Sequence, residues 1–470
     1  MTHQDHGRRR GTHARSLDRV LRWLLANVSL KGLAFRQDCS WTPRALMCAG
    51  LLWAWSDEPT LGERFATSRN IITWLLGEQL ELAGSYQAFV KLLRKWTGPL
   101  QERLQAAFRQ RMAADFPNLW TLAGWIIFAV DGSRVDVPRT RANEQRYSPH
   151  SKLSRAAQKC RCRRRRARKR RAEQNARKAN VPRIWLTVLW HVGCGLPWGW
   201  STGPSDSSER AHLQAMLSTL PPHALLVADA GFVGYEFWQT ILSSGRHLLV
   251  RVGSNVRLLQ KLGYARERAG TVYLWPDAVA KKRLAPLVLR LIVLRRKGRK
   301  MHLVTNILDP KQLSDAQAAE IYRRRWGIEL FYRHCKQTFE RGKLRSLNPD
   351  NALVELEWSL LGWWAMGLHS HYHLTQRGVP PDRVSFAGVL RAYRRPMREY
   401  KSVPETGQRL TDLLNRALID PYVRKNKASR DYPRKKQEQP PGAPVILPAT
   451  RQQTKQAQTI KIEPKIRLTA

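Results

Sequence analysis

Four side chains that can hold metal ions or phosphate groups occur within residues 321–336. They are Tyr322, Arg325, Glu329 and Lys336. Because an α-helix turns about 100° per residue, all four fall within an arc of ~60° on one helix face. Apolar residues flank that face, so the helix is expected to be partly buried. A carboxylate held among cations on such a helix indicates a site that binds both metal and phosphate.

Two aspartates are expected to complete this site. Asp131 and Asp229 each follow a short apolar run, at residues 125–130 and 225–228. Such runs predict buried strands, and the Gly-Ser pair after Asp131 signals a turn that ends the first strand. Ligands of α/β sheets gather at the carboxyl ends of the strands. We therefore predict that Asp131, Asp229 and Glu329 meet in one catalytic site.

Taken singly, each of these carboxylates has an ordinary structural explanation. A lone aspartate after a strand is usually a turn-former, and a glutamate on an arginine-rich helix is usually an ion-pair partner. Asp136 competes with Asp131, but it is expected to point to the opposite face of the strand. The joint pattern of two strand-end aspartates and a later helix with Glu329 among phosphate-binding neighbours favours the catalytic interpretation.

Three carboxylates in one site repel one another unless a cation neutralises them. Oxygen ligands with open positions favour Mg²⁺ or Mn²⁺. Two such ions about 3.5–4 Å apart can hold the attacking and leaving oxygens of a phosphodiester displacement. The pattern therefore predicts a two-metal site made by Asp131, Asp229 and Glu329, with Arg325 and Lys336 holding phosphates beside the metals.

The charge of the chain indicates a polyanionic partner. Its 470 residues include 82 Lys plus Arg against 36 Asp plus Glu, a formal net charge of +46. Nucleic acid is the first candidate and an anionic membrane the second. No apolar run reaches the ~18 residues of a membrane span, and no signal peptide follows Arg8–Arg10. Six cysteines are too few for a disulfide scaffold. These features favour a cytoplasmic protein associated with the nucleoid and without a membrane partner.

The pattern along the chain predicts four regions. They are, in order, a helical DNA-binding domain, a mixed α/β catalytic domain, a helical region and a basic disordered tail: residues 1–120, 121–345, 346–424 and 425–470. The catalytic domain contains a basic insertion at 141–180 and a β-strand insertion at 256–310. The arginine-rich run at 160–171 repels itself and cannot form a core, but it could anchor a phosphate backbone.

The sequence resembles the IS4 family of bacterial DDE transposases, the group that includes the Tn5 transposase. The family signature is Tyr, two residues, Arg, three residues, Glu, six residues, Lys. Every spacing is matched by Tyr322, Arg325, Glu329 and Lys336. The surroundings of Asp131 and Asp229 resemble the two aspartate motifs of the family, and Arg251 resembles another family position. The resemblance covers about residues 124–360 and does not extend clearly to either end.

The resemblance implies an RNase H-like catalytic core, a mixed sheet flanked by helices, with a β-strand insertion before the glutamate helix. It implies metal-dependent cutting at the ends of a DNA element and joining of the 3′-OH to target DNA. Tyr322, Arg325 and Lys336 would contact the DNA end near the cleavage point, in a dimer that synapses two ends. Relatives hold a flipped base on an aromatic residue, for which Trp275 and Trp326 are both candidates. The arginine-rich run departs from the family pattern.

The sequence therefore predicts the cut-and-paste transposase of an insertion sequence, acting on double-stranded DNA as a homodimer. The expected catalytic residues and metal ligands are Asp131, Asp229 and Glu329. The expected DNA contacts are Tyr322, Arg325, Lys336, Arg251 and Trp326. Two alternatives stay open. One is a nuclease of the same fold that cuts DNA without joining it, and the other is a non-catalytic DNA-binding descendant.

Overall fold

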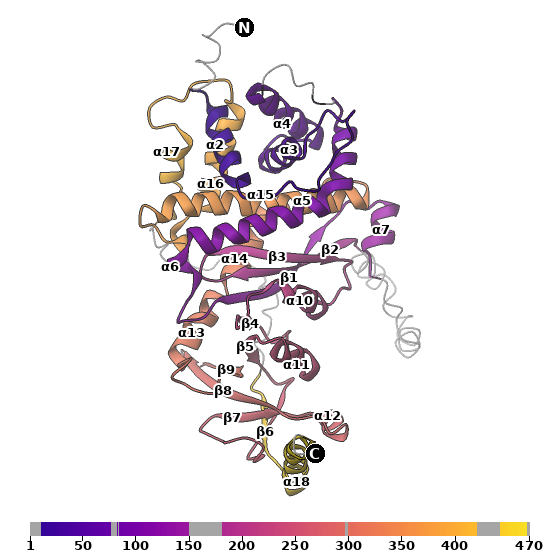
Figure 1. Ribbon diagram of the computed structural model, residues 1–470, viewed down its shortest axis with the longest axis vertical. Coiled ribbons are helices and arrows are strands. Elements are labelled where there is room, and N and C mark those ends of the chain that lie inside the picture. The colour runs from indigo at the N-terminus through magenta and orange to yellow at the C-terminus, as the bar shows by residue number, and fades with distance from the viewer. Residues whose placement is uncertain are drawn as a thin grey trace, which may run out of the picture.

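A computed structural model of the chain describes residues 11–76, 82, 84–149, 181–296, 299–420 and 442–467. The arginine-rich run at 160–171 lies outside the described residues, as does the rest of the predicted basic insertion beyond residue 149. Three levels follow one another along the longest axis of the molecule (Figure 1). They are a layer of helices, the main part of a mixed sheet, and a β-rich extension.

One mixed sheet runs through the described part of the molecule. Its core strands are β1 (Ile127–Asp136), β2 (Arg183–His191), β3 (Leu196–Gly203), β4 (Leu225–Ala228) and β5 (His247–Val252). The extension adds β6 (Arg257–Gln260), β7 (Thr271–Leu274), β8 (Leu287–Arg296), β9 (Arg299–Thr305) and β10 (Val445–Pro448). The spatial order is β10-β6-β7-β8-β9-β5-β4-β1-β2-β3.

The core strands have the RNase H-like arrangement that the resemblance predicts. β1, β2 and β3 are antiparallel neighbours, whereas β4 and β5 run parallel to β1. The crossovers to β4 and β5 contain α10 (Glu209–Met216), a 3-10 turn (Leu217–Thr219) and α11 (Tyr235–Ser243). β4 is buried along its whole length, as its continuous apolar run predicts. The predicted β insertion is also present, as β6 to β9 before the helix that begins at Asp315.

Helices from both ends of the described chain form the layer above the sheet. From the N-terminal part come α2 (His13–Leu25), α3 (Pro43–Trp55), α4 (Leu61–Leu76), α5 (Tyr86–Asp115), α6 (Pro117–Trp120) and α7 (Arg141–Tyr147). From the later part come α15 (Pro349–Thr375), a 3-10 turn (Pro381–Arg383), α16 (Phe386–Arg398) and α17 (Leu410–Asn415).

These two sets of helices pack against each other through α15. Trp55 Nε1 of α3 donates a hydrogen bond to the Gly362 carbonyl of α15 at 2.8 Å. α3, α5 and α15 each begin after a capping side chain, from Thr42, Ser85 and Asn348 respectively. The domain boundaries stay a prediction. None of the described helices combines the length and the apolar character that a bilayer span requires.

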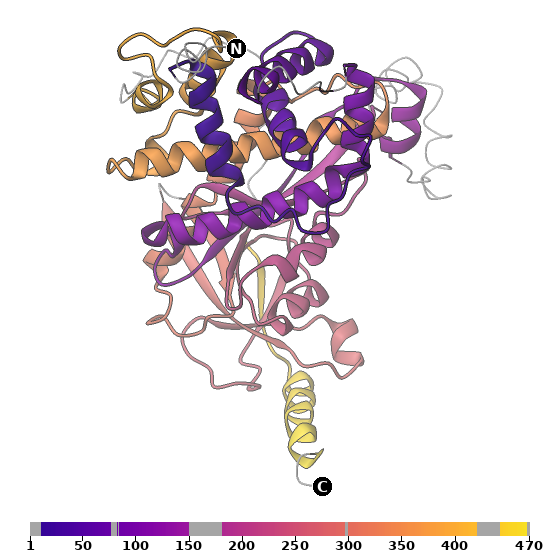
Figure 2. The same ribbon diagram turned by 45° about the horizontal axis from the view of Figure 1, so that its top comes forward.

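The expectation of a disordered tail is wrong for residues 442–467. β10 pairs in parallel with β6 at the end of the sheet, and α18 (Arg451–Arg467) follows it. Ala457 and Ile460 of α18 are buried, and Gln456 Nε2 donates to the Ala280 carbonyl at 2.7 Å. Figure 2 shows α18 at the far end of the extension. Tail composition alone missed these elements, because the open edge of β6 supplies the partner that a four-residue strand needs.

A glutamate buried in the helical layer predicts a pH-dependent stability. Burial raises the pKa of Glu357 on α15 to about 7, although the Trp200 indole N–H donates to its carboxylate. The folded protein therefore keeps a proton that the unfolded chain, with a pKa near 4.5, releases. Stability is expected to fall as pH rises from about 4.5 to 7, by on the order of 3 kcal/mol from this group.

The Glu357→Gln variant is expected to lose this component of the pH dependence. Urea unfolding followed by circular dichroism between pH 5 and 8 measures it, with the exposed Glu102→Gln on α5 as the control. Parallel stability curves for Glu357→Gln and wild type would contradict the assignment.

Candidate active site

Asp131 lies within β1 and not at its end, so the predicted turn after Asp131 is wrong. β1 continues to Asp136 and pairs with β2 along this stretch. β4, however, pairs with β1 only as far as Ala129 and Val227, and it ends at Ala228. Continuing that parallel register brings Asp131 level with Asp229. The two aspartates therefore meet where β1 loses its neighbour on the β4 side, which is the carboxyl end of β4.

The electrostatics of Asp131 reflect this crowding. Burial raises its pKa to about 7, and the charge of Asp229 acts in the same direction. The Gly132 N–H, which donates to Asp131 Oδ1 at 2.9 Å, and the charge of Arg325 oppose the shift. Asp229 Oδ1 accepts a hydrogen bond from the Gly231 N–H, also at 2.9 Å. Two carboxylates thus share a partly buried position.

A third carboxylate, that of Glu209, lies beside the two aspartates and was not predicted from the sequence. It occupies the first turn of α10, and a Cβ atom added to Gly132 would lie 2.3 Å from its Oε1. Glycine at 132 therefore leaves the space that the Glu209 carboxylate fills. Burial raises the pKa of Glu209, and Asp229 adds to the shift. Its only sequence signal is an acidic residue after Ser208 at the start of the helix that leads back to β4.

The sequence predicts one regular helix around Glu329. The structure instead has three joined segments there. They are α13 (Asp315–Arg324), α14 (Gly327–Arg333) and a π-helix (His334–Thr338). At the first junction the Trp326 N–H bonds to the Arg323 carbonyl and the Ile328 N–H to the Arg325 carbonyl. These i to i−3 bonds tighten the helix, whereas the π-helix widens it. The junction at Gly327 also packs closely, because an added Cβ would lie 3.0 Å from Trp190 Nε1.

Arg325 links the glutamate to the aspartates. Its Nη2 donates to Glu329 Oε1 at 2.7 Å, and its charge also acts on Asp131. The guanidinium carbon lies 5.3 Å from the centre of the Tyr322 ring. Burial raises the pKa of Tyr322, and the charges of Arg325 and Arg251 oppose that shift. Arg251, on β5, therefore belongs to the same electrostatic cluster.

Lys336 reaches the site from the π-helix. Its Nζ donates to Ser133 Oγ at 2.6 Å. Ser133 lies two residues beyond Asp131 and so on the same face of β1. The Tyr332 hydroxyl donates to the Asp131 carbonyl oxygen at 2.7 Å, which holds α14 against β1. Burial lowers the pKa of Lys336, although the charge of Asp131 acts in the opposite direction.

Residues 126–364, more than half of the chain, match the family described as the transposase DDE domain. The chain belongs to this family of DDE transposases. Transposase InsG for insertion sequence element IS4, from Escherichia coli (strain K12), is 26% identical to it over 196 residues. This match confirms the resemblance to the IS4 family. It covers 39% of this chain and 44% of the relative, so the chain spans less than half the length of the curated relative it matches.

The structure also resembles that of the piggyBac transposase in a synaptic complex with hairpin DNA. The TM-score is 0.39 and the sequence identity 11%, with 89% of this chain and 86% of that chain covered. This likeness is too remote to bear on the function of the chain.

The two tryptophans considered for this DDE transposase differ in accessibility. Trp275 is only 3% exposed and its Nε1 donates to the Leu284 carbonyl at 2.8 Å. Trp326 is 58% exposed at the junction between α13 and α14. A base can stack on Trp326 without disturbing the core, whereas Trp275 would first have to leave its packing.

The carboxylates of this transposase domain fit a divalent cation by their chemistry. Besides burial, the charges of Asp229 and Glu209 raise the pKa of Asp131, and the charge of Asp229 raises that of Glu209; a bound cation would relieve this repulsion. Their oxygens are the donors that Mg²⁺ and Mn²⁺ prefer. Within the described residues no group of three or more His, Cys, Asp or Glu side chains is arranged to hold a metal ion. Glu329 is instead paired with Arg325.

Proposed function

We propose that this chain is the transposase of an insertion sequence, which cuts the ends of a DNA element and joins the 3′-OH to target DNA. The observation that carries the proposal is the meeting of Asp131 and Asp229 at the open side of β1, with Arg325 and Glu329 beside them. This cluster lies inside a transposase DDE domain. Phosphodiester chemistry needs such a concentration of anionic ligands next to phosphate-binding cations.

Asp131, Asp229 and Glu329 would hold two divalent ions, Mg²⁺ or Mn²⁺, once Glu329 exchanges its ion pair with Arg325 for a cation. When bound, such ions lower the pKa of the attacking hydroxyl and stabilise the leaving oxygen. Glu209 adds negative charge beside Asp229 and would strengthen cation binding. Burial makes Asp131 easier to protonate than an ordinary aspartate, so cation binding there would displace a proton.

The cations of the cluster would position the DNA end. Arg325 is released from Glu329 in this scheme, and its planar fork can then hold two oxygens of one phosphate. Lys336 offers a point charge next to Ser133, and Arg251 offers a further guanidinium near Tyr322. Trp326 would stack on a base displaced from the duplex, because its ring is exposed at the edge of the cluster.

The proposed partners follow from the reaction. The substrates are double-stranded DNA at the element ends and at the target, and two copies of the chain would hold two ends together. The N-terminal helices would contribute to DNA binding. A net charge of +46 suits a protein that works on the nucleoid in the cytoplasm.

A joining assay tests the proposed function. The full chain is mixed with Mg²⁺, supercoiled plasmid and linear duplexes that carry the inverted repeats from either side of the reading frame. We expect covalent joining of the 3′ ends of the duplexes to the plasmid, seen as slower-migrating labelled DNA. Duplexes with a 3′-dideoxy end are the control, because they lack the attacking hydroxyl.

Each alternative gives a different result in this assay. Cutting of uncut ends without joining of pre-cut ends would identify a nuclease of the same fold. Binding without cutting or joining would identify a non-catalytic descendant. Either result would overturn the transposase proposal.

A further inference from the structure

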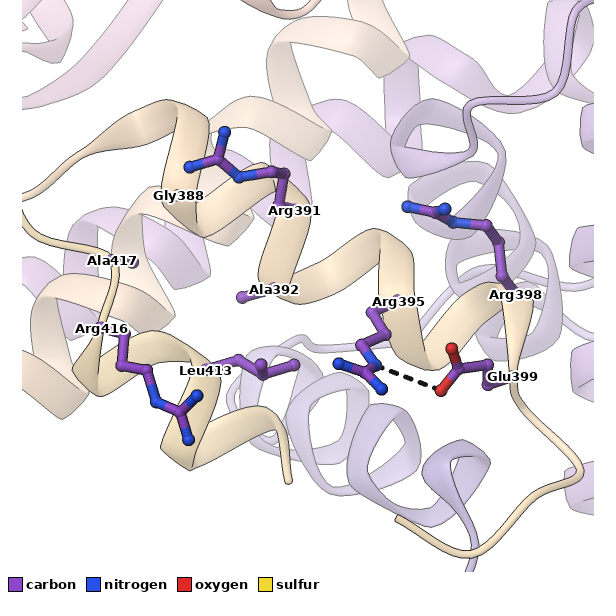
Figure 3. A pocket seen from close by; sticks show the side chains of 9 residues that line it. All are labelled: Gly388, Arg391, Ala392, Arg395, Arg398, Glu399, Leu413, Arg416 and Ala417. Carbon is purple, nitrogen blue, oxygen red and sulfur yellow. Dashed lines mark hydrogen bonds and ion pairs between the residues drawn. The ribbon is translucent and has the colours of Figure 1, made fainter. Parts of the chain in front are cut away.

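A groove lined by arginines lies in the helical layer, outside the carboxylate cluster. We call it the arginine groove, and it encloses about 440 Å³ between α16 and the end of α17. The residues that line it are Gly388, Arg391, Ala392, Arg395, Arg398, Glu399, Leu413, Arg416 and Ala417. Figure 3 shows three of the arginines along α16 and Arg416 on the facing segment. Four guanidinium groups thus accompany one carboxylate.

The backbone holds the two walls of the groove at a fixed separation. Arg391, Arg395 and Arg398 follow one another at i, i+4 and i+7, so they share one face of α16. An added Cβ at Gly388 would lie 2.8 Å from Ala417 Cα, so only glycine permits this approach. The Ser385 N–H donates to the Ala417 carbonyl at 2.8 Å. Arg416 is therefore positioned opposite the helix face by backbone contacts and not by its own flexible side chain.

The charge of the groove is incompletely neutralised. Arg395 Nε donates to Glu399 Oε2 at 3.2 Å, and Arg398 Nε lies 3.5 Å from Asp57 Oδ2. Arg416 Nη2 donates to the Gly407 carbonyl, and no described carboxylate forms an ion pair with it. Arg391 is exposed. Guanidinium groups that keep free donors at an open groove favour a ligand with several separate anionic oxygens.

α16, which carries three arginines of the groove, also packs against the π-helix that carries Lys336. α16 begins at Phe386, whose ring stacks on His334 with centroids 5.6 Å apart and planes 10° apart. His334 is the first residue of the π-helix that carries Lys336. A helix rises about 1.5 Å per residue, so Arg391 lies only ~8 Å further along α16 than Phe386. The groove and Lys336 therefore belong to two elements that pack against each other.

We propose that the arginine groove binds the phosphate backbone of duplex DNA at a place outside the active site. This inference rests on the proposed function, because it takes DNA as the substrate. Phosphates recur along a backbone as the arginines recur along α16, and guanidinium forks bind them without reading sequence. Contacts of this kind fix the path and register of the duplex and contribute affinity that depends on salt.

The test measures binding of the full chain to a labelled 40-bp duplex of arbitrary sequence at several salt concentrations. Arg391→Gln combined with Arg416→Gln removes one proposed phosphate contact from each wall. Each contact contributes about −0.9 to the slope of log K against log salt. We therefore expect a slope shallower by ~2, and roughly 50-fold weaker binding at 0.1 M salt.

Two further variants guard against general charge effects and misfolding. Lys281→Gln combined with Lys282→Gln removes the same charge from the exposed end of α12 (Asp277–Lys281). Figure 1 shows α12 at the opposite end of the molecule from α16 and α17. Its effect on binding is expected to be several-fold smaller. Glu399→Gln removes the single carboxylate of the groove and frees Arg395, so it should tighten binding by about 3- to 10-fold. A misfolded protein would not gain affinity.

The inference is overturned if the groove variant binds with the wild-type slope, or if the lysine variant loses as much affinity. In either case cutting and joining by the wild-type chain would leave the proposed function standing. The opposite result is also distinct. If the wild-type chain neither cuts nor joins DNA, but the groove variant shows the shallower salt slope, the proposed function alone is refuted.

Discussion

Glu329→Gln is expected to lower the rate of DNA-end cleavage by at least ~10³-fold. The amide keeps the shape of the side chain but has no charge with which to hold a cation. Loss of one anionic ligand from a two-metal site costs several kcal/mol of transition-state stabilisation, and each 1.36 kcal/mol corresponds to about tenfold in rate. Single-turnover cleavage of a labelled element end in Mg²⁺ measures the effect. DNA binding should persist, because the substitution removes negative charge.

Glu320→Gln is the matched control for this prediction. Glu320 belongs to α13, just before the junction, and its carboxylate pairs with Arg323 and Arg324 at the surface. Because this surface pairing contributes little, we expect cleavage within about twofold of wild type. Cleavage by Glu329→Gln at the wild-type rate would show that Glu329 is not a metal ligand. The assignment of the site would then be wrong.

Trp358→Ala is expected to destabilise the protein by about 3–5 kcal/mol, the usual cost of emptying a large buried aromatic site. The Trp358 side chain is 0% exposed, and its Nε1 donates to Thr97 Oγ1 of α5 at 2.9 Å. A Cβ added to Gly50 of α3 would lie 2.3 Å from its ring. The indole therefore joins three helices of the layer that supports the sheet. Urea denaturation followed by circular dichroism gives the change in unfolding free energy.

Trp326→Ala removes the same side chain from an exposed position and serves as the comparison. Its unfolding free energy is expected to stay within about 0.5 kcal/mol of wild type, although DNA-end cleavage should weaken if the ring stacks on a base. Equal destabilisation by the two substitutions would show that burial of Trp358 does not hold the helical layer together.

Much of the fold followed from local pattern. The apolar run at 225–228 is the buried strand that it predicts, and the side chain of Asn348 caps the start of a long helix. Apolar periodicity and caps act over a few residues, so a single sequence displays them directly. The RNase H-like order of the strands came from the family resemblance and is present in the structure.

Other features were out of reach of local pattern. The glutamate helix is tightened near Trp326, and there Gly327 lies close against Trp190 of β2, a contact between residues far apart in the sequence. The strand β10 exists because β6 offers an open edge almost 200 residues earlier in the chain. Nothing near residue 445 signals that partner, and basic composition there indicated disorder.

The sequence by itself determined the chemical types of the site and the spacing of Tyr322, Arg325, Glu329 and Lys336, because these lie within a few helical turns. The tertiary structure decided how they are used. Arg325 stands between Glu329 and Asp131, Lys336 bonds Ser133, and Glu209 joins the aspartates through the space left at Gly132. Only chain packing brings together groups from separate elements of the chain, since their mutual distance depends on every element between them.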